Sequence, residues 1–259
     1  MKVIVIASGS KGNATYIEYQ NTKLLIDAGV TTKRIKEELA KYQIKCSTID
    51  GILVTHEHSD HIKCIEKVSK LLKADIYMSP LSINGSSNQM QKVFDELNVY
   101  ELLGEVKYQI GDLIVVPITL SHDTNNVFGF LIKAGSESLA YLTDTGEIDT
   151  KYINLLRQMN YLIIESNHDE EMLINSDREY MLKRRILSKE GHLSNHQCAT
   201  YLKDIINEKT KAIMLAHLSE ECNTEVLAIE ASLKTINESN YQPKLLVAKQ
   251  HESVVLVND

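Results

Sequence analysis

Cysteine and long apolar runs are scarce in this 259-residue sequence. Its four cysteines, Cys46, Cys64, Cys198 and Cys222, are far apart and form no CxxC pair. The sequence therefore predicts neither a disulfide framework nor a thiolate zinc site. The apolar run within MKVIVIASGSKGN is shorter than a signal sequence or a membrane-spanning helix requires. Elsewhere the sequence has no long stretch that is both uncharged and apolar. We therefore expect a cytoplasmic protein without a membrane segment.

An excess of positive charge is also lacking, because the formal net charge is −7. Nonspecific binding to nucleic acid depends on many Lys and Arg side chains that neutralise phosphates. The charge balance excludes a protein coated in positive charge, so any polyanionic substrate must be held locally. No internal repeat or low-complexity linker interrupts the chain, and 43% of its residues are hydrophobic. We expect a single domain over residues 1–259.

Short β-branched runs alternate with amphipathic stretches, a pattern that predicts an α/β fold with helices covering a sheet core. Helices are predicted over residues 31–42, 80–97, 194–207 and 223–238, and a further helix, N-capped by Ser59, follows the motif HEHSDH. The predicted strands are 2–7, 14–19, 22–29, 49–55, 74–79, 113–121, 127–134, 138–146, 161–166, 211–218 and 253–258.

The motif HEHSDH lies between a buried strand and an amphipathic helix. His122, Asp144 and His217 each stand at the end of another predicted strand, where side chains converge in a layered α/β fold. An isolated histidine at a strand end is usually a surface or hydrogen-bonded group, but the dense motif favours metal ligands for the whole set. Imidazole nitrogens and carboxylate oxygens suit zinc, manganese or iron. The count of donors is sufficient for two divalent metal ions.

These motifs resemble a known family. THEHSDH, together with SHD, TDTG and AHLS, resembles the metallo-β-lactamase-fold hydrolases over essentially the whole chain. ASGSKGNATYIE, LLIDAG, GILVTHEHSDHIK, ESNHD and GHLSN resemble more closely its WalJ (YycJ)-like branch, which is related to nucleases. The resemblance implies an αββα sandwich, with two mixed β-sheets flanked by helices and a dinuclear site. It assigns His56, His58 and His122 to one ion, Asp60, His61 and His217 to the other, and Asp144 to both.

Two departures from the family pattern are informative. Cys64 stands where these relatives often have Gly, and we expect it to change the packing without adding a ligand. The segment between TDTG and GHLSN is too short for the extra domain of β-CASP-type RNA-processing relatives. Those larger nucleases are therefore poorer guides to this chain.

Two divalent ions about 3.5–4 Å apart can activate a water for hydrolysis and stabilise the charge that develops on the oxygens of the substrate. A phosphodiester fits such a site, and its leaving oxygen needs a proton. We expect Asp60 and His192 to be catalytic, with His192 as general acid or phosphate contact. The alternative for His192 is a polar loop residue that caps the helix starting near Ser194.

Three further groups have both structural and functional interpretations. Glu165 and His168, in ESNHD, are expected to orient ligands or contact substrate. Lys183, Arg184 and Arg185 form either a solvated helix face or a contact for the backbone of a polyanion. The loop SGSKGN lacks the ending of a nucleotide P-loop, so a tight turn is as good an interpretation as a phosphate site.

The sequence therefore predicts a dinuclear metal-dependent hydrolase, foremost a phosphodiesterase or DNA exonuclease acting on nucleic acid. The alternatives are hydrolysis of a small thioester, lactam or cyclic phosphodiester, and a non-catalytic metal-bound regulator. A redox diiron site is disfavoured, because the second position of the motif is His58 and not a carboxylate.

Overall fold

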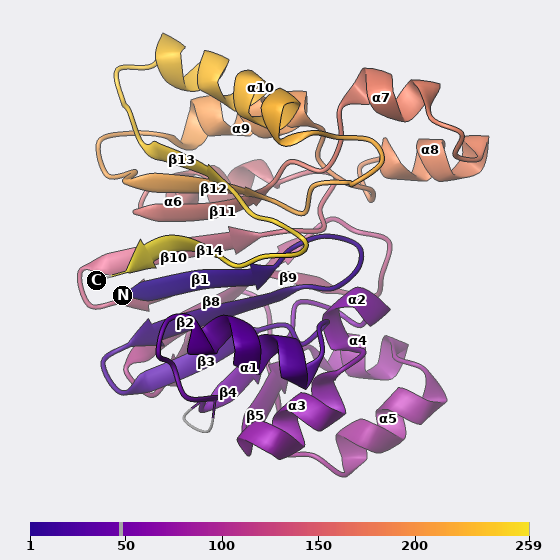
Figure 1. Ribbon diagram of the computed structural model, residues 1–259, viewed down its shortest axis with the longest axis vertical. Helices are drawn as coiled ribbons and strands as arrows, with labels where there is room; N and C mark the ends of the chain where they lie inside the picture. The colour runs from indigo at the N-terminus through magenta and orange to yellow at the C-terminus, as the bar shows by residue number, and fades with distance from the viewer. Residues whose placement is uncertain (47–48, 259) are drawn as a thin grey trace. The chain divides into compact units, whose positions relative to one another are not determined.

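The computed structural model describes residues 1–46 and 49–258 (Figure 1). Contacts between Cα atoms divide the chain into two compact units, which are described separately below. Unit 1 comprises Met1–Thr119, Thr124–Phe128 and Lys249–Asp259, and unit 2 comprises Leu120–Asp123 and Gly129–Ala248. The expectation of one domain over residues 1–259 stays a prediction. Within the described residues, no helix has the length and apolar character needed to span a membrane.

Every strand predicted from the sequence is present. The strands are β1 (Lys2–Ala7), β2 (Ala14–Tyr19), β3 (Thr22–Ile26), β4 (Gly51–Leu53), β5 (Asp75–Met78), β6 (Val99–Glu101), β7 (Tyr108–Ile110), β8 (Leu113–Leu120), β9 (Val127–Ala134), β10 (Glu137–Leu142), β11 (Tyr161–Glu165), β12 (Ala212–Ala216), β13 (Lys244–Val247) and β14 (Val254–Asn258). The sequence did not reveal β6, β7 and β13, because runs of three or four residues are too short to show a period of two.

The strands form two mixed seven-stranded sheets, ordered β14-β1-β2-β3-β4-β5-β6 and β13-β12-β11-β10-β9-β8-β7. In the first sheet, β14, β1, β2 and β3 pair antiparallel, while β3, β4, β5 and β6 pair parallel. In the second, β10, β11, β12 and β13 run parallel. Parallel neighbours end at the same sheet edge, so residues that follow them lie close together.

Helices accompany both sheets. They are α1 (Thr32–Ala40), α2 (Ser59–Ile62), α3 (Ile65–Leu72), α4 (Pro80–Gly85), α5 (Asn88–Asp95), the 3-10 helix η2 (Thr150–Tyr152), α6 (Ile153–Leu156), α7 (Glu170–Asn175), α8 (Tyr180–Ile186), α9 (Asn195–Ile205) and α10 (Glu225–Glu238). In unit 2, α9 and α10 lie side by side, and α10 contacts β13 (Figure 1). The sequence analysis did not predict η2, α6, α7 or α8.

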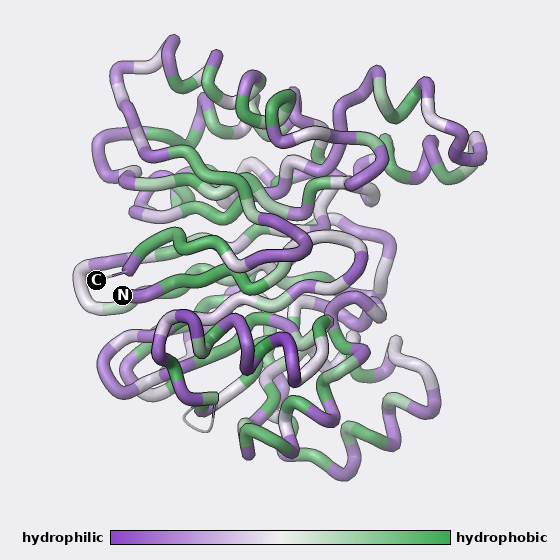
Figure 2. The backbone as a smooth tube through the Cα atoms, in the orientation of Figure 1, coloured by the Kyte–Doolittle hydropathy of each residue, from purple (hydrophilic) through white to green (hydrophobic). Residues whose placement is uncertain are grey.

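The core of unit 1 follows the predicted amphipathic pattern. Ile35 and Leu39 of α1 and Val68 of α3 are buried in one cluster with Tyr16 and Ile52 of the sheet. Figure 2 shows β1 mainly in hydrophobic colours, whereas α1 carries mostly hydrophilic ones. Burial of the apolar stripes of α1 and α3 on the sheet therefore stabilises unit 1.

Two helix predictions were wrong in detail. The helix after HEHSDH is split into α2 and α3, and α2 is N-capped by His58 and not by Ser59. The split occurs because the Cys64 N–H donates to the Ala28 carbonyl at 3.1 Å and leaves the helical pattern. The predicted helix over residues 80–97 is likewise two helices, α4 and α5, each with its own serine N-cap.

Candidate metal centre

The HEHSDH motif of unit 1 follows β4 and continues into α2. His56 and His61 are fully buried, whereas His58 and Asp60 are partly exposed. The ring centroids of His56 and His58 are 4.6 Å apart, and those of His56 and His61 are 4.1 Å apart. The motif therefore does gather its imidazoles in one place, as the sequence predicts.

Asp27, which follows β3, orients the histidines of the HEHSDH motif. One of its oxygens lies 2.8 Å from His61 Nδ1, and its carboxylate accepts from the backbone N–H and the hydroxyl of Thr55. Thr55 Oγ1 is also 3.0 Å from Nδ1 of both His56 and His61. Burial raises the pKa of Asp27, and its contacts with His61 and Thr55 oppose the rise. A carboxylate on Nδ1 fixes the ring and leaves Nε2 as the ligand atom.

His61 and Asp60 present a pair of ligand atoms. His61 Nε2 lies 3.3 Å from Asp60 Oδ2, a separation that two ligands of one ion commonly have. The Asn13 side chain donates to Asp60 Oδ2 at 3.2 Å and is 3.0 Å from His61 Nε2. Asn13 therefore holds the Asp60–His61 pair from the opposite side to Asp27.

The SGSKGN loop is a tight turn and its amides are used inside the protein. Gly9 N donates to the Asn13 side chain, Gly12 N to Gly9 O, and Asn13 N to Asp60 O. A Cβ on Gly29 would come within 1.5 Å of the Asp60 carbonyl oxygen, so only glycine fits there. These contacts support the tight-turn interpretation of the loop over a phosphate site.

Unit 2 carries a second group of candidate ligands, which lie at separate strand ends. Asp144 follows β10, His217 follows β12, and His122 follows β8. Asp144 Oδ1 lies 3.9 Å from His122 Nε2 and 3.5 Å from His217 Nε2. Since the resemblance assigns these two histidines to different ions, the position of Asp144 between them fits a carboxylate that both ions share.

The other ring nitrogens of these two histidines are already engaged. His122 Nδ1 donates to the Gly191 carbonyl at 2.9 Å, and His217 Nδ1 to Glu165 Oε1 at 2.8 Å. Burial lowers the pKa of His122, although Asp144 opposes the shift. A neutral imidazole that donates from Nδ1 keeps the lone pair on Nε2, which is the form a metal ligand needs.

Glu165 at the end of β11 links a predicted ligand to the predicted acid. Its Oε1 lies 2.8 Å from His217 Nδ1 and 2.8 Å from His192 Nδ1, while its Oε2 accepts from the N–H of Thr145 and Leu193. Burial opposes ionisation of Glu165, but the two histidines outweigh it and lower its pKa to about 2. Glu165 is thus an anion that orients both rings.

His192 does not cap the following helix. Ser194 is the N-cap of α9, in a reciprocal capping box with Gln197. The side chain of His192 is 16% exposed and its Nδ1 is 4.0 Å from Asp144 Oδ1. His192 therefore keeps a solvent-accessible face beside Asp144 and Glu165, as a general acid would need.

His168, which follows β11, is buried, and Asp169 caps the next helix. Both ring nitrogens of His168 lack a hydrogen-bond partner among the described residues, and burial lowers its pKa to about 4. Asp169 is the N-cap of α7 and accepts from Met172 N. The structure thus gives Asp169 a capping role and leaves the role of His168 as a prediction.

The basic run lies on α8 and most of it is engaged. Lys183 Nζ donates to the carbonyls of Ile174 and Ser176, and Arg185 Nε is 2.6 Å from Asp123 Oδ2. Arg184 lies over the ring of Tyr180 at 5.9 Å. Among the three cations predicted to contact a polyanion, Arg184 is the one with neither an ion pair nor a side-chain hydrogen bond within the described part of the chain.

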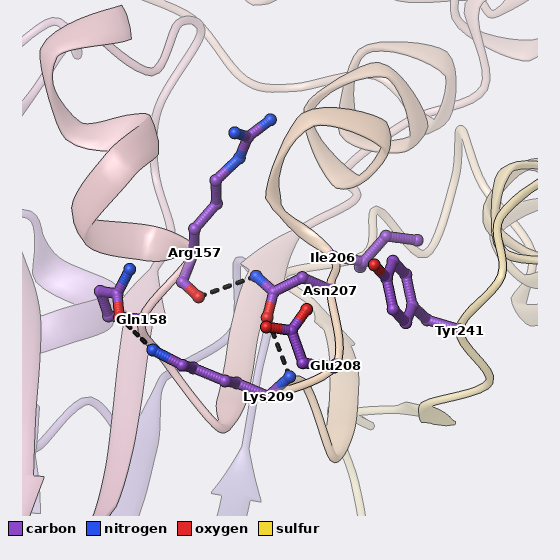
Figure 3. Close-up of a pocket in the computed structure, with 7 residues that line it drawn as sticks. All are labelled: Arg157, Gln158, Ile206, Asn207, Glu208, Lys209 and Tyr241. Carbon is purple, nitrogen blue, oxygen red and sulfur yellow. Dashed lines mark hydrogen bonds between the residues drawn. The ribbon is translucent and has the colours of Figure 1, made fainter.

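A surface pocket in unit 2 lies away from this chemistry (Figure 3). Its lining includes Arg157 and Gln158, which precede β11, and Asn207 and Lys209, which precede β12. Glu165 and His217 stand at the opposite ends of these parallel strands. Asn207 donates to Arg157 O, and Lys209 to Gln158. The pocket's polar groups therefore bond to one another, and it is not part of the candidate centre.

Sequence reasoning missed Asp27, Thr55 and Asn13 as site residues. The available signal was an aspartate directly after the buried run TKLLI, where a charge is costly unless it serves a partner. Backbone strain gave no signal in the sequence. Asp27, Asp144 and His217 all adopt left-handed φ values, of 62°, 57° and 57°, a conformation that is uncommon outside glycine and concentrates at functional sites.

With this geometry established, comparisons with known proteins are informative. The Beta-lactamase superfamily domain model matches residues 22–217, and the chain belongs to that superfamily. The crystal structure of the metallo-beta-lactamase fold protein YhfI from Bacillus subtilis superposes with a TM-score of 0.73, at 16% identity and over 98% of both chains. The predicted fold class, a metallo-β-lactamase fold with two mixed sheets and flanking helices, is confirmed.

Two curated relatives match over most of their length. Exodeoxyribonuclease YycJ of Bacillus anthracis is 33% identical over 92% of this chain and 89% of its own. Exodeoxyribonuclease WalJ of Streptococcus pneumoniae serotype 2 is 35% identical over 88% of this chain and 85% of its own. These similarities confirm the predicted WalJ-like branch, and the fold implies divalent metal ions.

Proposed function

We propose that this chain is a metal-dependent DNA exonuclease. The observation that carries the proposal is the bridge made by Glu165, which contacts both a predicted metal ligand, His217, and the partly exposed His192. A hydrolase of phosphodiesters needs bound metal and a proton for the leaving oxygen, and this carboxylate serves both needs. The similarity to two proteins named exodeoxyribonucleases supports DNA as the substrate.

We propose the ligand sets that the family motifs assign. The donors are His56, His58 and His122 for one ion, Asp60, His61 and His217 for the other, and Asp144 for both. Within each unit the fit is supported by the fixed Nδ1 atoms of His61, His122 and His217. At His61 the Asn13 amide lies 3.0 Å from Nε2, so a bound ion would take the place of this contact. The nitrogen and oxygen donors suit zinc, manganese or iron. When bound, such ions would activate water and neutralise charge on phosphate oxygens.

In the proposed reaction, side chains of the protein orient the metal ligands and donate a proton to the leaving oxygen. His192 Nδ1 donates to the Glu165 anion, which fixes the orientation of the ring. We assign a proton on Nε2 of the same ring to the leaving oxygen of the scissile bond. Asp60, oriented by Asn13, fixes its ligand oxygen beside His61. A cytoplasmic location stays a prediction.

The test uses linear duplex DNA with one labelled end, added manganese or zinc, and product sizing over time. Wild type should shorten the DNA progressively from one end. His58→Ala and Asp144→Ala should leave the DNA intact and reduce the bound metal while keeping the circular dichroism spectrum of wild type. His196→Ala, an exposed histidine of α9, is the matched control and should cleave as wild type does.

Two outcomes would contradict the proposal. Normal cleavage by the His58 and Asp144 variants would remove these residues from the mechanism. Intact DNA in the presence of metal-loaded wild type would redirect the search to a small thioester, lactam or cyclic phosphodiester substrate. If the metal-loaded protein hydrolysed none of these, the non-catalytic regulator would be the better hypothesis.

A further inference from the structure

The helical pair α7 and α8 is a small structure of its own within unit 2. Figure 1 shows the two helices together, apart from α9 and α10. Leu173 of α7, Ile186 of α8 and Cys222 form a separate apolar cluster, with Met172 packed against it. Lys183 joins the helices through hydrogen bonds of 2.7 and 2.6 Å to the carbonyls of Ile174 and Ser176. The pair is thus fixed from within by few contacts.

The start of α8 presents large apolar side chains to solvent. Tyr180 is 71% exposed and Met181 68%, the highest values among the large hydrophobic residues described. Leaving such surface in water costs about 25 cal/mol per Å². A single exposed apolar residue is ordinary, but two adjacent ones beside a cation form a surface suited to a ligand with a flat apolar face.

Cations predominate along α8 and the residues after it, although exposed Asp177 and Glu179 immediately precede Tyr180. Residues 180–189 contain four cations and no acidic residue, although the chain as a whole carries −7. Arg185 and Lys189 are ion-paired, with Asp123 and Glu147, and Lys183 is bound to carbonyls. The exposed guanidinium of Arg184 is 5.9 Å from the centre of the Tyr180 ring. An aromatic ring and an adjacent arginine together match a nucleotide, which has a base and a phosphate.

The surface is connected rigidly to the predicted acid. His192 N donates to the carbonyl of Ile186, the last residue of α8, at 3.0 Å. A Cβ on Gly191 would come within 2.2 Å of the same oxygen, so the backbone is closely packed there. Tyr180 lies six residues before Ile186, which is about 9 Å along the helix axis. A strand that extended from His192 along α8 would therefore reach Tyr180 within a few nucleotides.

We propose that Tyr180, Met181 and Arg184 bind an unpaired strand of the DNA substrate, with a base stacked on the Tyr180 ring and a phosphate on Arg184. The proposal rests on the proposed exonuclease function and adds to it how the substrate strand is held. Stacking tolerates any base, because every base has a flat face, and therefore suits an enzyme that removes nucleotides in succession.

The test measures binding separately from cleavage. A fluorescent 12-residue oligodeoxythymidylate and a duplex of equal length are titrated with the full chain carrying Asp144→Ala, which prevents cleavage, in the presence of manganese. Adding Tyr180→Ala or Arg184→Ala should raise the Kd for the single strand at least about fivefold and change the duplex Kd much less. Tyr180→Phe should bind as the parent protein does.

Matched controls come from surfaces elsewhere. Tyr100→Ala replaces a tyrosine that is 52% exposed, and Val226→Ala an apolar side chain that is 61% exposed. Neither should alter either Kd. Because Tyr180 and Arg184 are exposed, their variants should unfold at the melting temperature of the parent, which separates lost binding from lost folding.

The outcomes distinguish this inference from the proposed function. Unchanged single-strand binding by both variants, with wild type still cleaving DNA, would overturn the inference alone. Equal losses on single strand and duplex would also overturn it, because stacking on an unpaired base would not explain them. A dimer that Tyr180→Ala abolishes, with unchanged DNA binding, would assign the surface to a second copy instead. Failure of wild type to bind or cleave any DNA would refute both proposals.

Discussion

The candidate ligands of the two units are presented in opposite ways. In unit 1 the donors come from one short segment, residues 56–61, which main-chain hydrogen bonds to Asn13 and Ala28 hold in place. In unit 2 they come from His122, Asp144 and His217, which follow three different strands. A local motif can thus be fixed by its own backbone, whereas a dispersed set depends on side chains that connect the strand ends.

The carboxylates that orient the candidate ligands, Asp27 and Glu165, also differ in which site residues they contact. Asp27 contacts one predicted ligand, His61, together with the hydroxyl and amide of Thr55. Glu165 contacts the predicted ligand His217 and the predicted acid His192. Loss of Asp27 should therefore affect metal binding alone, while loss of Glu165 should affect metal binding and proton transfer together.

Glu165→Gln is expected to have the largest effect. Glutamine keeps the shape of the side chain but removes the anion that accepts from His192 Nδ1 and orients the ring. At saturating metal, kcat for DNA cleavage should fall roughly a hundredfold or more, and excess metal should not restore it. Single-turnover cleavage over a metal titration measures this. Glu208→Gln, on the pocket of Figure 3, is the control. Full rescue by metal would show that Glu165 is only a support for a ligand.

Asp27→Asn should have a smaller and reversible effect. Removing the carboxylate from His61 Nδ1 should weaken metal binding roughly 10- to 100-fold, as loss of such a partner typically does. With excess metal, kcat should return to that of wild type, because no proton donor is touched. Isothermal titration with manganese, followed by kinetics at saturation, tests both parts. Asp95→Asn, an exposed residue of α5, serves for comparison. A persistent loss of kcat would contradict the contrast between the two carboxylates.

His168 should produce the smallest effect, seen in stability against pH. Its folded-state pKa of about 4 lies below the usual value of 6.5. Between these values the unfolded chain binds a proton that the folded chain does not, so stability falls as the pH falls. From pH 6.5 to 5 this group should cost about 1.5 kcal/mol. Urea unfolding of wild type and His168→Gln, both without metal, should show a steeper pH dependence in wild type. Equal slopes would be inconsistent with a buried neutral His168.

How much the sequence revealed depends on how local each feature is. The HEHSDH motif was predictable because its donors adjoin one another, and the strands before it and before Asp144 and His217 showed clear apolar runs. The partners Asp27 and Asn13 were not predictable, because their contacts with His61 join distant segments.

Helix boundaries failed for a related reason. The break between α2 and α3 comes from one hydrogen bond, Cys64 N–H to Ala28 O, which no periodic pattern in the sequence reports. The sequence identified the basic run but did not show what each of its cations contacts. Only the structure shows that Lys183 links α8 to α7 by a hydrogen bond to the Ile174 carbonyl, while Arg184 lies beside the Tyr180 ring.

The left-handed backbone at Asp144 and His217 has an evolutionary consequence. Each conformation costs on the order of 1 kcal/mol that a glycine would not incur. Exchange of Asp144 for glycine would remove both this strain and the burial of a charge, so the altered chain could be better folded than the original while binding no metal. Selection for stability alone would thus favour an inert scaffold at these two positions.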